Sequence, residues 1–389
     1  MKKALRNAFR LFQDMDKGLL IATTVLFSFG LLNIVTASSS EATANNTSLY
    51  YFFYQQLKMI SIGVVFGIVI LNIDTKKYPP FAIIAYIIIT SILLYLSFYG
   101  SDYRGARNWV QIGPIRFQPS EFAKPILIVC LSLMFEKYAS RLRNRKIPHT
   151  EMIVKIVVVG LAIPIIIFLQ KDFGTMFILL CTFLVMFMAS PILRIDKVRA
   201  FGVMGLIAIL GMVGMYTGKG YILSEEQLDR FDFFNPCTKY ETGGYQICNG
   251  YIAINDGGLL GVGPGKSKQK YSYIPEPHTD SVFAIIAEEY GFLKSSLIFI
   301  LYLYVIKRII NLACRANTLR GRFMCLGVAT YIFMHILVNL GGLFGVMPLT
   351  GVPLPFLSYG GTFAISLIAS LAIVQRVHIE TRRQKVKLR

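Results

Sequence analysis

The apolar stretch Pro79-Pro-Phe-Ala-Ile-Ile-Ala-Tyr-Ile-Ile-Ile-Thr-Ser-Ile-Leu-Leu-Tyr-Leu-Ser-Phe-Tyr99 contains no charged residue. A helix needs about 20 mostly apolar residues to cross the hydrocarbon core of a bilayer, so this stretch predicts a membrane-spanning helix. Similar segments lie near 18–37, 58–73, 120–136, 152–169, 174–190, 201–217, 292–308, 324–343 and 361–376. The sequence therefore predicts an all-α polytopic membrane protein with about ten transmembrane helices.

The composition supports this fold class. Of 389 residues, 54% are hydrophobic and 16% are charged, and the mean hydropathy is +0.57. A chain this apolar has the bilayer as its solvent. Because no segment resembles a soluble domain and no repeat recurs at a fixed period, we expect one integral membrane domain over residues 1–389.

Clusters of Lys and Arg predict the orientation, because such clusters mark cytoplasmic loops. With a cytoplasmic N-terminus, the inner side collects Lys2, Lys3, Arg6, Arg10, Lys17, Lys76, Lys77, Arg141, Arg143, Arg145, Lys146, Arg194, Lys197, Arg199, Lys307, Arg308, Arg315, Arg320, Arg322 and the basic C-terminal tail. Both termini are then cytoplasmic, and residues 218–280 form one large extracellular loop on the same side as 100–119 and 344–360. The net charge of +19 thus indicates contact with lipid head groups and the insertion machinery, not nucleic acid.

The most chemically informative segment is Ile274-Pro-Glu-Pro-His-Thr-Asp-Ser281, at the end of the large loop. Asp280 could simply cap the apolar run that follows. A cap does not explain the neighbouring Glu276 and His278, so the cluster favours a functional site. Gly291 predicts a helix break, with 281–290 as a re-entrant or interfacial helix, because Glu288 and Glu289 would be costly in lipid.

Two further exterior segments carry polar residues next to predicted spans. In Gln118-Pro-Ser-Glu-Phe-Ala-Lys124, the i, i+3 spacing places Glu121 and Lys124 on one helical face. They could mark a helix start, with Ser120 as cap and a snorkelling lysine, or a charged cavity at the membrane rim. Asp172 could likewise be a helix cap.

The large loop contains two other patterns. Glycines 257, 258, 261, 263 and 265 precede Lys266 and Ser267, but a phosphate-binding loop would need a glycine at Leu260, so we expect no nucleotide. The glycines instead predict a backbone that can approach a ligand closely. Cys237 and Cys248 both lie outside the membrane, where a disulfide persists, and we hypothesise that they pair.

Several multi-residue motifs, in order, resemble those of the SEDS family (shape, elongation, division and sporulation; FtsW/RodA). These motifs are Gly105-Ala-Arg-Asn-Trp109, Gln118 to Lys124, Gln170 to Thr175, Asn235-Pro236, Gly244-Tyr-Gln246, the glycine stretch, Pro275 to Asp280, Pro348 to Phe356 and Ser358-Tyr-Gly-Gly361. The resemblance covers nearly the whole chain. The chain departs from the family pattern at Asn108, Lys171 and Ser281, none of which removes Asp280.

The resemblance implies a peptidoglycan glycosyltransferase that polymerises lipid II on the outer face of the bacterial cytoplasmic membrane, with Asp280 as the catalytic aspartate. A carboxylate general base suits a weak sugar nucleophile, and cations suit a pyrophosphate leaving group. The candidate substrate-binding residues are Glu121, Lys124, Arg107, Gln118, Ser120, Glu276, His278, Thr279, Asp172, Lys266 and Ser358, with Lys268 and Lys270 as further cations.

The resemblance also implies partners. The expected partner is a class B penicillin-binding protein (a transpeptidase), together with other divisome or elongasome membrane proteins; a division role like that of FtsW is preferred over elongation. A divalent cation, Mg²⁺ or Mn²⁺, is a candidate cofactor, with Asp280 and Glu276 as candidate ligands. The alternatives are a lipid II flippase or transporter, and a scaffold for a transpeptidase without catalytic activity.

Overall fold

The computed structural model describes residues 11–100, 106–113, 115–143, 149–219, 236–239, 244–271 and 273–387. Its α-helices are α2 (Lys17–Ala37), α3 (Ser39–Ala44), α4 (Tyr51–Asn72), α5 (Tyr78–Tyr99), α6 (Pro119–Arg143), α7 (His149–Leu169), α8 (Phe173–Ala189), α9 (Arg194–Lys219), α11 (Tyr245–Gly257), α12 (Val282–Arg315), α13 (Leu319–Leu343) and α14 (Gly361–Lys387). Two 3₁₀ turns (Thr75–Lys77 and Pro236–Lys239) and a short antiparallel pair, β1 (Val110–Ile112) and β2 (Ile115–Phe117), complete the described elements. The predicted all-α membrane fold is confirmed.

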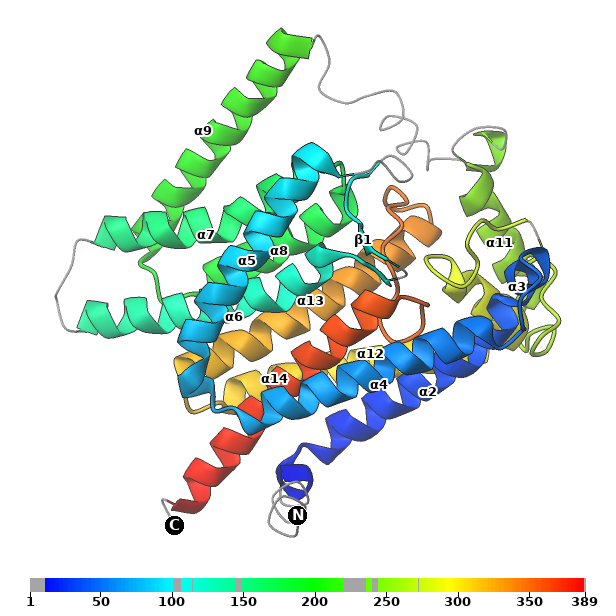
Figure 1. Ribbon diagram of the computed structural model, residues 1–389, viewed down its shortest axis with the longest axis horizontal. Coiled ribbons are helices and arrows are strands. Elements are labelled where there is room, and N and C mark those ends of the chain that lie inside the picture. The colour runs from blue at the N-terminus through cyan, green and yellow to red at the C-terminus, as the bar shows by residue number, and fades with distance from the viewer. Residues whose placement is uncertain are drawn as a thin grey trace.

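Each of the ten predicted apolar segments coincides with a helix; 58–73 and 174–190 extend one residue beyond the C-terminal ends of α4 and α8. Within the part of the chain that the structure describes, seven helices are long and apolar enough to cross a membrane, namely α2, α4, α5, α7, α12, α13 and α14, and α8 is a shorter apolar helix. The number of spans and their orientation stay predictions. The start of α2 and the end of α14 lie at the same end of the bundle, as the predicted topology requires (Figure 1).

The bundle is built around α13, most of whose apolar length is buried. Helices α4 and α14 lie side by side, and α14 also packs against α13 (Figure 1). Their close approach depends on small residues, because a Cβ on Gly63 would lie 3.2 Å from the Cα of Ile365. In contrast, α9 projects away from the other helices (Figure 1).

The predicted helix break at Gly291 is confirmed, because this residue has φ 76° and ψ 176° inside α12. In the short helix that precedes the break, Glu288 and Glu289 are buried. Lys270 Nζ donates to Glu289 Oε1 at 3.1 Å, and the backbone N–H of Lys268 donates to Glu288 Oε1 at 2.7 Å. The large loop thus supplies partners for both carboxylates, and the re-entrant or interfacial position of 281–290 stays a prediction.

The described residues of the large loop are therefore folded against the helices. It contains α11, and its segment 257–263 packs against the α12 kink. A Cβ on Gly261 would lie 2.3 Å from the carbonyl oxygen of Glu289, so only glycine permits this contact. Gly105, Asn235 and the remainder of the loop at 220–235 and 240–243 lie outside the described residues.

Candidate functional site

Asp280 lies where the large loop and segment 344–360 meet the end of α13. The side-chain amide of Asn339 donates to the carbonyl oxygens of Asp280, at 2.7 Å, and of Val352, at 2.8 Å. A second link joins the same loops, because the backbone N–H of Tyr359 donates to the carbonyl oxygen of His278 at 2.8 Å. The backbone that carries Asp280 is thus fixed to segment 344–360 and to a long buried helix.

Asp280 is a partly exposed residue. Burial raises its pKa to about 6, and the negative charge of Glu276 adds to this effect, whereas hydrogen bonds from Thr279 and Gln246 oppose it. Thr279 Oγ1 lies 3.2 Å from Asp280 Oδ1. A carboxylate with a pKa near 6 is mostly ionised at neutral pH and basic enough to accept a proton, which suits a general base.

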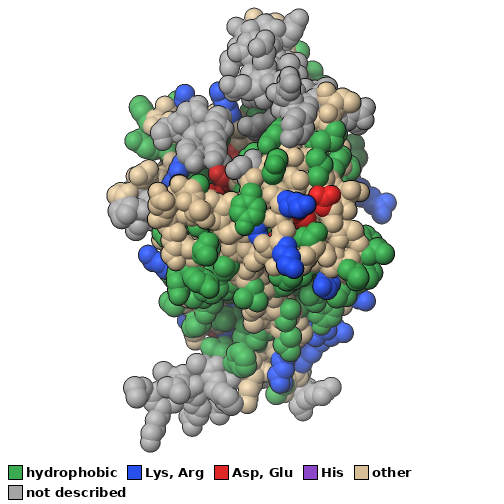
Figure 2. Space-filling view, turned by 90° about the vertical axis from the view of Figure 1, so that its right-hand side faces the viewer, with side chains coloured by type: hydrophobic (Ala, Val, Ile, Leu, Met, Phe, Trp, Pro, Cys, Tyr) green, Lys and Arg blue, Asp and Glu red, His purple; other side chains and the backbone are tan. Residues whose placement is uncertain are grey.

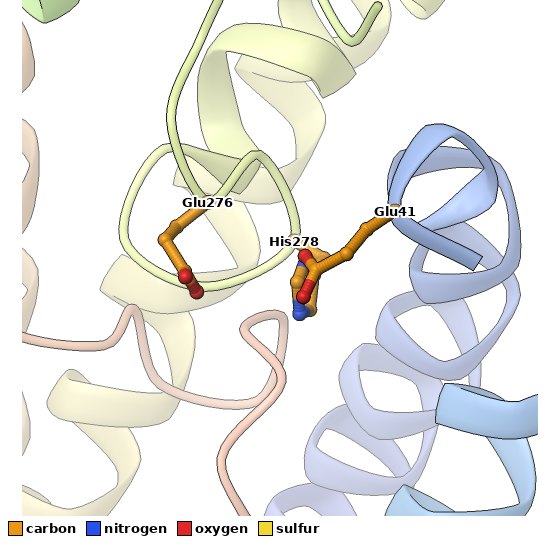
Figure 3. A group of neighbouring side chains, drawn as sticks. All are labelled: Glu41, Glu276 and His278. Carbon is orange, nitrogen blue, oxygen red and sulfur yellow. The ribbon is translucent and has the colours of Figure 1, made fainter. Parts of the chain in front are cut away.

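Glu41, Glu276 and His278 form a cluster (Figure 3), and two of its members belong to the segment that carries Asp280. Their ligand atoms all lie within 4.8 Å of one another, and His278 Nδ1 lies 3.2 Å from Glu41 Oε2. His278 is buried between the rings of Phe52 and Tyr359, at centroid distances of 4.6 and 5.3 Å, and burial lowers its pKa to about 4. Its imidazole is therefore neutral at physiological pH.

Lys124 lies inside the bundle, since its side chain is 1% exposed and that of Glu121 is 3% exposed. Its ammonium donates to Glu121 Oε1 at 2.7 Å and lies 3.0 Å from His335 Nε2. Because an ammonium only donates, Nε2 accepts, which leaves the imidazole proton on Nδ1, 3.2 Å from the carbonyl oxygen of Pro353. This geometry favours a positioning role for Lys124 over direct contact with a pyrophosphate.

The Lys124 group and Asp280 are joined through one loop. His335 and Asn339 are four residues apart on α13, so they share a helical face. His335 binds the carbonyl of Pro353 and Asn339 that of Val352. Asn339 also binds Asp280, so the buried charges near the start of α6 are connected to the backbone of the candidate base.

Asp172 is the N-cap of α8 and accepts from the backbone N–H of Thr175 at 3.1 Å. It also accepts from the side-chain amides of Asn108, at 2.7 Å, and Gln118, at 3.0 Å. These bonds tie segment 106–118 to the α7–α8 turn. For Asp172 and Gln118, the geometry favours the structural interpretation.

The other candidates lie in different surroundings. Ser120 is buried in the first turn of α6, where it makes no cap bond within the described residues. Ser358 is also buried, and its hydroxyl accepts from the backbone N–H of Leu354 at 2.8 Å, which shapes the loop rather than a binding surface. Arg107 is partly buried, and Lys266 is exposed on the large loop.

The structure bears on two other inferences from the sequence, disfavouring the first and agreeing with the second. Lys270, one of the suggested leaving-group cations, is 2% exposed and paired with Glu289, which removes it from any substrate surface. Cys237 and Cys248 form a disulfide that joins the Pro236–Lys239 turn to α11.

Sequence reasoning missed Glu41, His335 and Asn339. Glu41 follows three serines and belongs to no motif, so only the tertiary structure reveals it. His335 and Asn339 did carry a signal, because two polar residues at i, i+4 in an apolar span predict a polar helix face in the bundle interior.

The end of the molecule that carries α3 and α11 is seen face-on in Figure 2. Lys and Arg side chains are visible there as separate patches, and acidic side chains show only as small patches among hydrophobic and backbone surface (Figure 2). This surface is suited to approach by an anionic ligand.

Comparisons with known proteins give a consistent result. The family described as "Cell cycle protein", which comprises FtsW, RodA and SpoVE, matches residues 17–383. Stage V sporulation protein E of Bacillus subtilis is 30% identical over 364 residues, covering 93% of this chain and 96% of the relative. The probable peptidoglycan glycosyltransferase FtsW of the same organism is 31% identical over 377 residues, covering 95% and 91%.

Two solved structures share the fold. One is a chain from a study of a peptidoglycan synthase complex that coordinates polymerization and crosslinking, with a TM-score of 0.74, 24% identity and coverage of 94% of this chain and 98% of that chain. The other is the rod shape determining protein RodA of Thermus thermophilus, with a TM-score of 0.66, 24% identity and coverage of 94% and 96%.

Proposed function

The chain belongs to the FtsW/RodA/SpoVE family of cell cycle proteins and is a multi-pass membrane peptidoglycan glycosyltransferase, and from this premise we propose that it polymerises lipid II with Asp280 as general base. The reaction takes place on the outer face of the bacterial cytoplasmic membrane, where the predicted orientation puts the large loop. The observation that carries this assignment is the position of Asp280, a partly exposed residue whose carboxyl group has a pKa near 6, at the junction of the large loop and segment 344–360.

The chemistry requires a base. The 4-hydroxyl of the acceptor GlcNAc attacks the anomeric carbon of the donor MurNAc, a new C–O bond forms, and the bond to the lipid pyrophosphate breaks. The hydroxyl proton passes to Asp280, which is about nine-tenths ionised at pH 7 if its pKa is 6. A positioned base of this kind contributes about 10²- to 10⁴-fold to the rate.

The leaving pyrophosphate gains negative charge as the bond breaks, and nearby cations stabilise that charge. Lys266 and Lys268 are exposed on the same loop and suit this role, as does Arg107. Lys124 acts at a distance instead, by holding His335 and thereby segment 344–360.

A divalent cation fits the cluster of Glu41, Glu276 and His278. Two carboxylates and a neutral imidazole are a donor set that suits Mn²⁺ better than Mg²⁺, which prefers oxygen ligands. The neutral state of His278 leaves a ring nitrogen available, and Nδ1 is buried without a well-aligned hydrogen bond within the described residues. A bound cation would supply positive charge next to the leaving group, whereas Thr279 and Glu276 orient the segment that carries Asp280.

The test of the base is steady-state polymerisation of lipid II by Asp280→Asn, with Asp256→Asn as the matched control. Asp256 is an exposed carboxylate of α11, on the same loop. We expect kcat to fall by about 10²- to 10⁴-fold for Asp280→Asn with little change in KM, and no effect for the control. Equal activity of the two variants would remove Asp280 from the reaction.

The metal site has a separate test that does not depend on activity. Mn²⁺ should raise the melting temperature of the purified wild-type protein, and this shift should be lost in Glu41→Gln and His278→Gln but kept in Asp256→Asn. A shift of the same size in all four proteins would show that the cation binds elsewhere.

The expected partner is a class B penicillin-binding protein. A structural neighbour comes from a complex that both polymerises and crosslinks peptidoglycan, so we expect a transpeptidase to bind this chain as well. Co-purification with the transpeptidase encoded in the same organism would test this expectation.

A further inference from the structure

A groove with a cavity volume of about 700 Å³ lies between α5, α6 and α7. It is lined by the first half of α5 and the second half of α6, and it reaches Arg320 at the start of α13. Arg320 bonds to Thr75, which in turn bonds to Glu380 near the end of α14. The groove therefore opens at the same end of the bundle as the end of α14. This end is opposite the large loop and is the face predicted to be cytoplasmic.

The walls of the groove are apolar over most of their length. They are formed by Ala82, Ile83, Tyr86 and Ile87 of α5 and by Leu133 and Met134 of α6. The volume lies within the range of about 300–1,000 Å³ that is typical of small-molecule sites. A hollow of this composition at membrane depth suits a hydrocarbon chain.

The charged residues at one end of the groove are not balanced. Glu136 is paired with Arg320 at 2.8 Å, so these two charges cancel. Lys137 and Arg141 make no ion pair within the described residues; the hydrogen-bond contact of Arg141 is a long one, 4.0 Å to Met152 Sδ. The carboxylate of Glu151, whose charge acts on Arg141, is itself paired with Lys155.

Lys137, Ser140 and Arg141 have the spacing i, i+3, i+4, so they lie on one face of α6. Snorkelling would explain two basic side chains at a membrane rim. It would not explain why both, with a hydroxyl between them, border an apolar hollow. Two cations at the mouth of a hydrocarbon-sized groove complement an anionic amphiphile in charge and in polarity.

We propose that this groove binds an anionic glycerophospholipid of the cytoplasmic leaflet. Its phosphate lies between Lys137, Ser140 and Arg141, and an acyl chain lies along α5. The site is independent of the catalytic assignment, because none of its residues belongs to the Asp280 region. Each basic residue near a membrane surface favours an anionic lipid about fivefold, so two predict a preference of about 30-fold over a zwitterionic lipid.

The chain has one tryptophan, Trp109, which allows a direct measurement. In an Ile87→Trp, Trp109→Phe variant the only tryptophan lines the groove, and its emission can be excited selectively over that of the tyrosines. We expect brominated phosphatidylglycerol to quench it at about 30-fold lower mole fraction than brominated phosphatidylcholine with the same chains. Adding Lys137→Gln and Arg141→Gln should abolish this preference.

The matched control is Lys307→Gln with Arg322→Gln, which removes the same two charges at the same predicted face but outside the groove. This control should keep the preference. Equal quenching by the two lipids, a preference that survives the loss of Lys137 and Arg141, or an equal loss in the control would overturn the proposal. Displacement of the brominated lipid by a polyprenyl phosphate at far lower mole fraction would contradict the assignment to a glycerophospholipid.

Discussion

The buried ion pair of Lys124 and Glu121 should be strongly coupled. Both side chains are nearly inaccessible, at 1% and 3% exposure, and Glu121 Oε2 has no hydrogen-bond partner within the described residues. Lys124→Met would leave this carboxylate buried without its counter-ion, which costs about 3–5 kcal/mol of unfolding free energy. In Glu121→Gln, Lys124 retains His335 as a partner, so the cost should be smaller.

The double substitution Glu121→Gln, Lys124→Met removes both charges together. It should be about 2–3 kcal/mol more stable than the sum of the single effects predicts. The unfolding free energies of the four proteins, measured by denaturant titration in mixed micelles, give this coupling. Activity should not recover with stability, because His335 has still lost the donor that fixes the loop near Asp280.

The control is an ion pair with the same charges but different burial. Lys155 and Glu151 are 60% and 58% exposed, so Lys155→Met should change stability by less than about 1 kcal/mol. If the Lys124 and Glu121 effects add to within about 0.5 kcal/mol, or if Lys124→Met costs no more than Lys155→Met, the account of a buried, coupled pair is refuted.

Other consequences follow from specific contacts. Burial raises the pKa of Asp280 in the folded state to about 6, so ionisation of this carboxyl group opposes folding. Asp280→Asn should therefore raise the unfolding free energy of the chelator-treated protein by about 1–3 kcal/mol above pH 6, and should not raise it below pH 4. An unfolding free energy that does not rise at either pH would indicate a solvated carboxyl group. Lys270→Met should cost about 3–5 kcal/mol by leaving Glu289 unpaired, and a loss below 1 kcal/mol in denaturant titration would exclude a buried pair. Non-reduced protein should contain no free thiol at Cys237 or Cys248, and two labelled thiols in a mass-spectrometric assay would argue against the disulfide.

The order and positions of the helices could be predicted because they depend on the local composition of each segment. Ten apolar segments predicted ten helical segments, and a glycine before an apolar run predicted the break at Gly291. The lipid-facing sides of the helices require only hydrophobic residues, so the sequence signal there is strong.

The site could be predicted only in part. Asp280 stood out because three ionisable residues lie within five positions. The partners of that segment come from distant parts of the chain: Glu41 from α3 and Asn339 from α13. Nothing in their local sequence indicates which loop they contact.

The environment of charged residues was the hardest feature to predict. Glu288 and Glu289 were expected in a re-entrant or interfacial helix, but their sequence did not indicate that Lys270 and the backbone of the large loop would bind them. For Lys124, the sequence allowed either a snorkelling side chain or a charged cavity at the membrane rim. The structure encloses Lys124 with Glu121 and His335, so its side chain does not snorkel. In both cases the deciding factor is which distant segment packs against the helix.

The central claim is that this chain polymerises lipid II through Asp280. The most direct measurement uses proteoliposomes of wild type and Asp280→Ala, each alone and with the cognate transpeptidase, and follows both glycan polymer and movement of lipid II across the bilayer. We predict long glycan strands from wild type and none from the folded variant. Normal polymer from Asp280→Ala, or movement of lipid II without polymer from wild type, would contradict the account and favour a scaffold or a transporter.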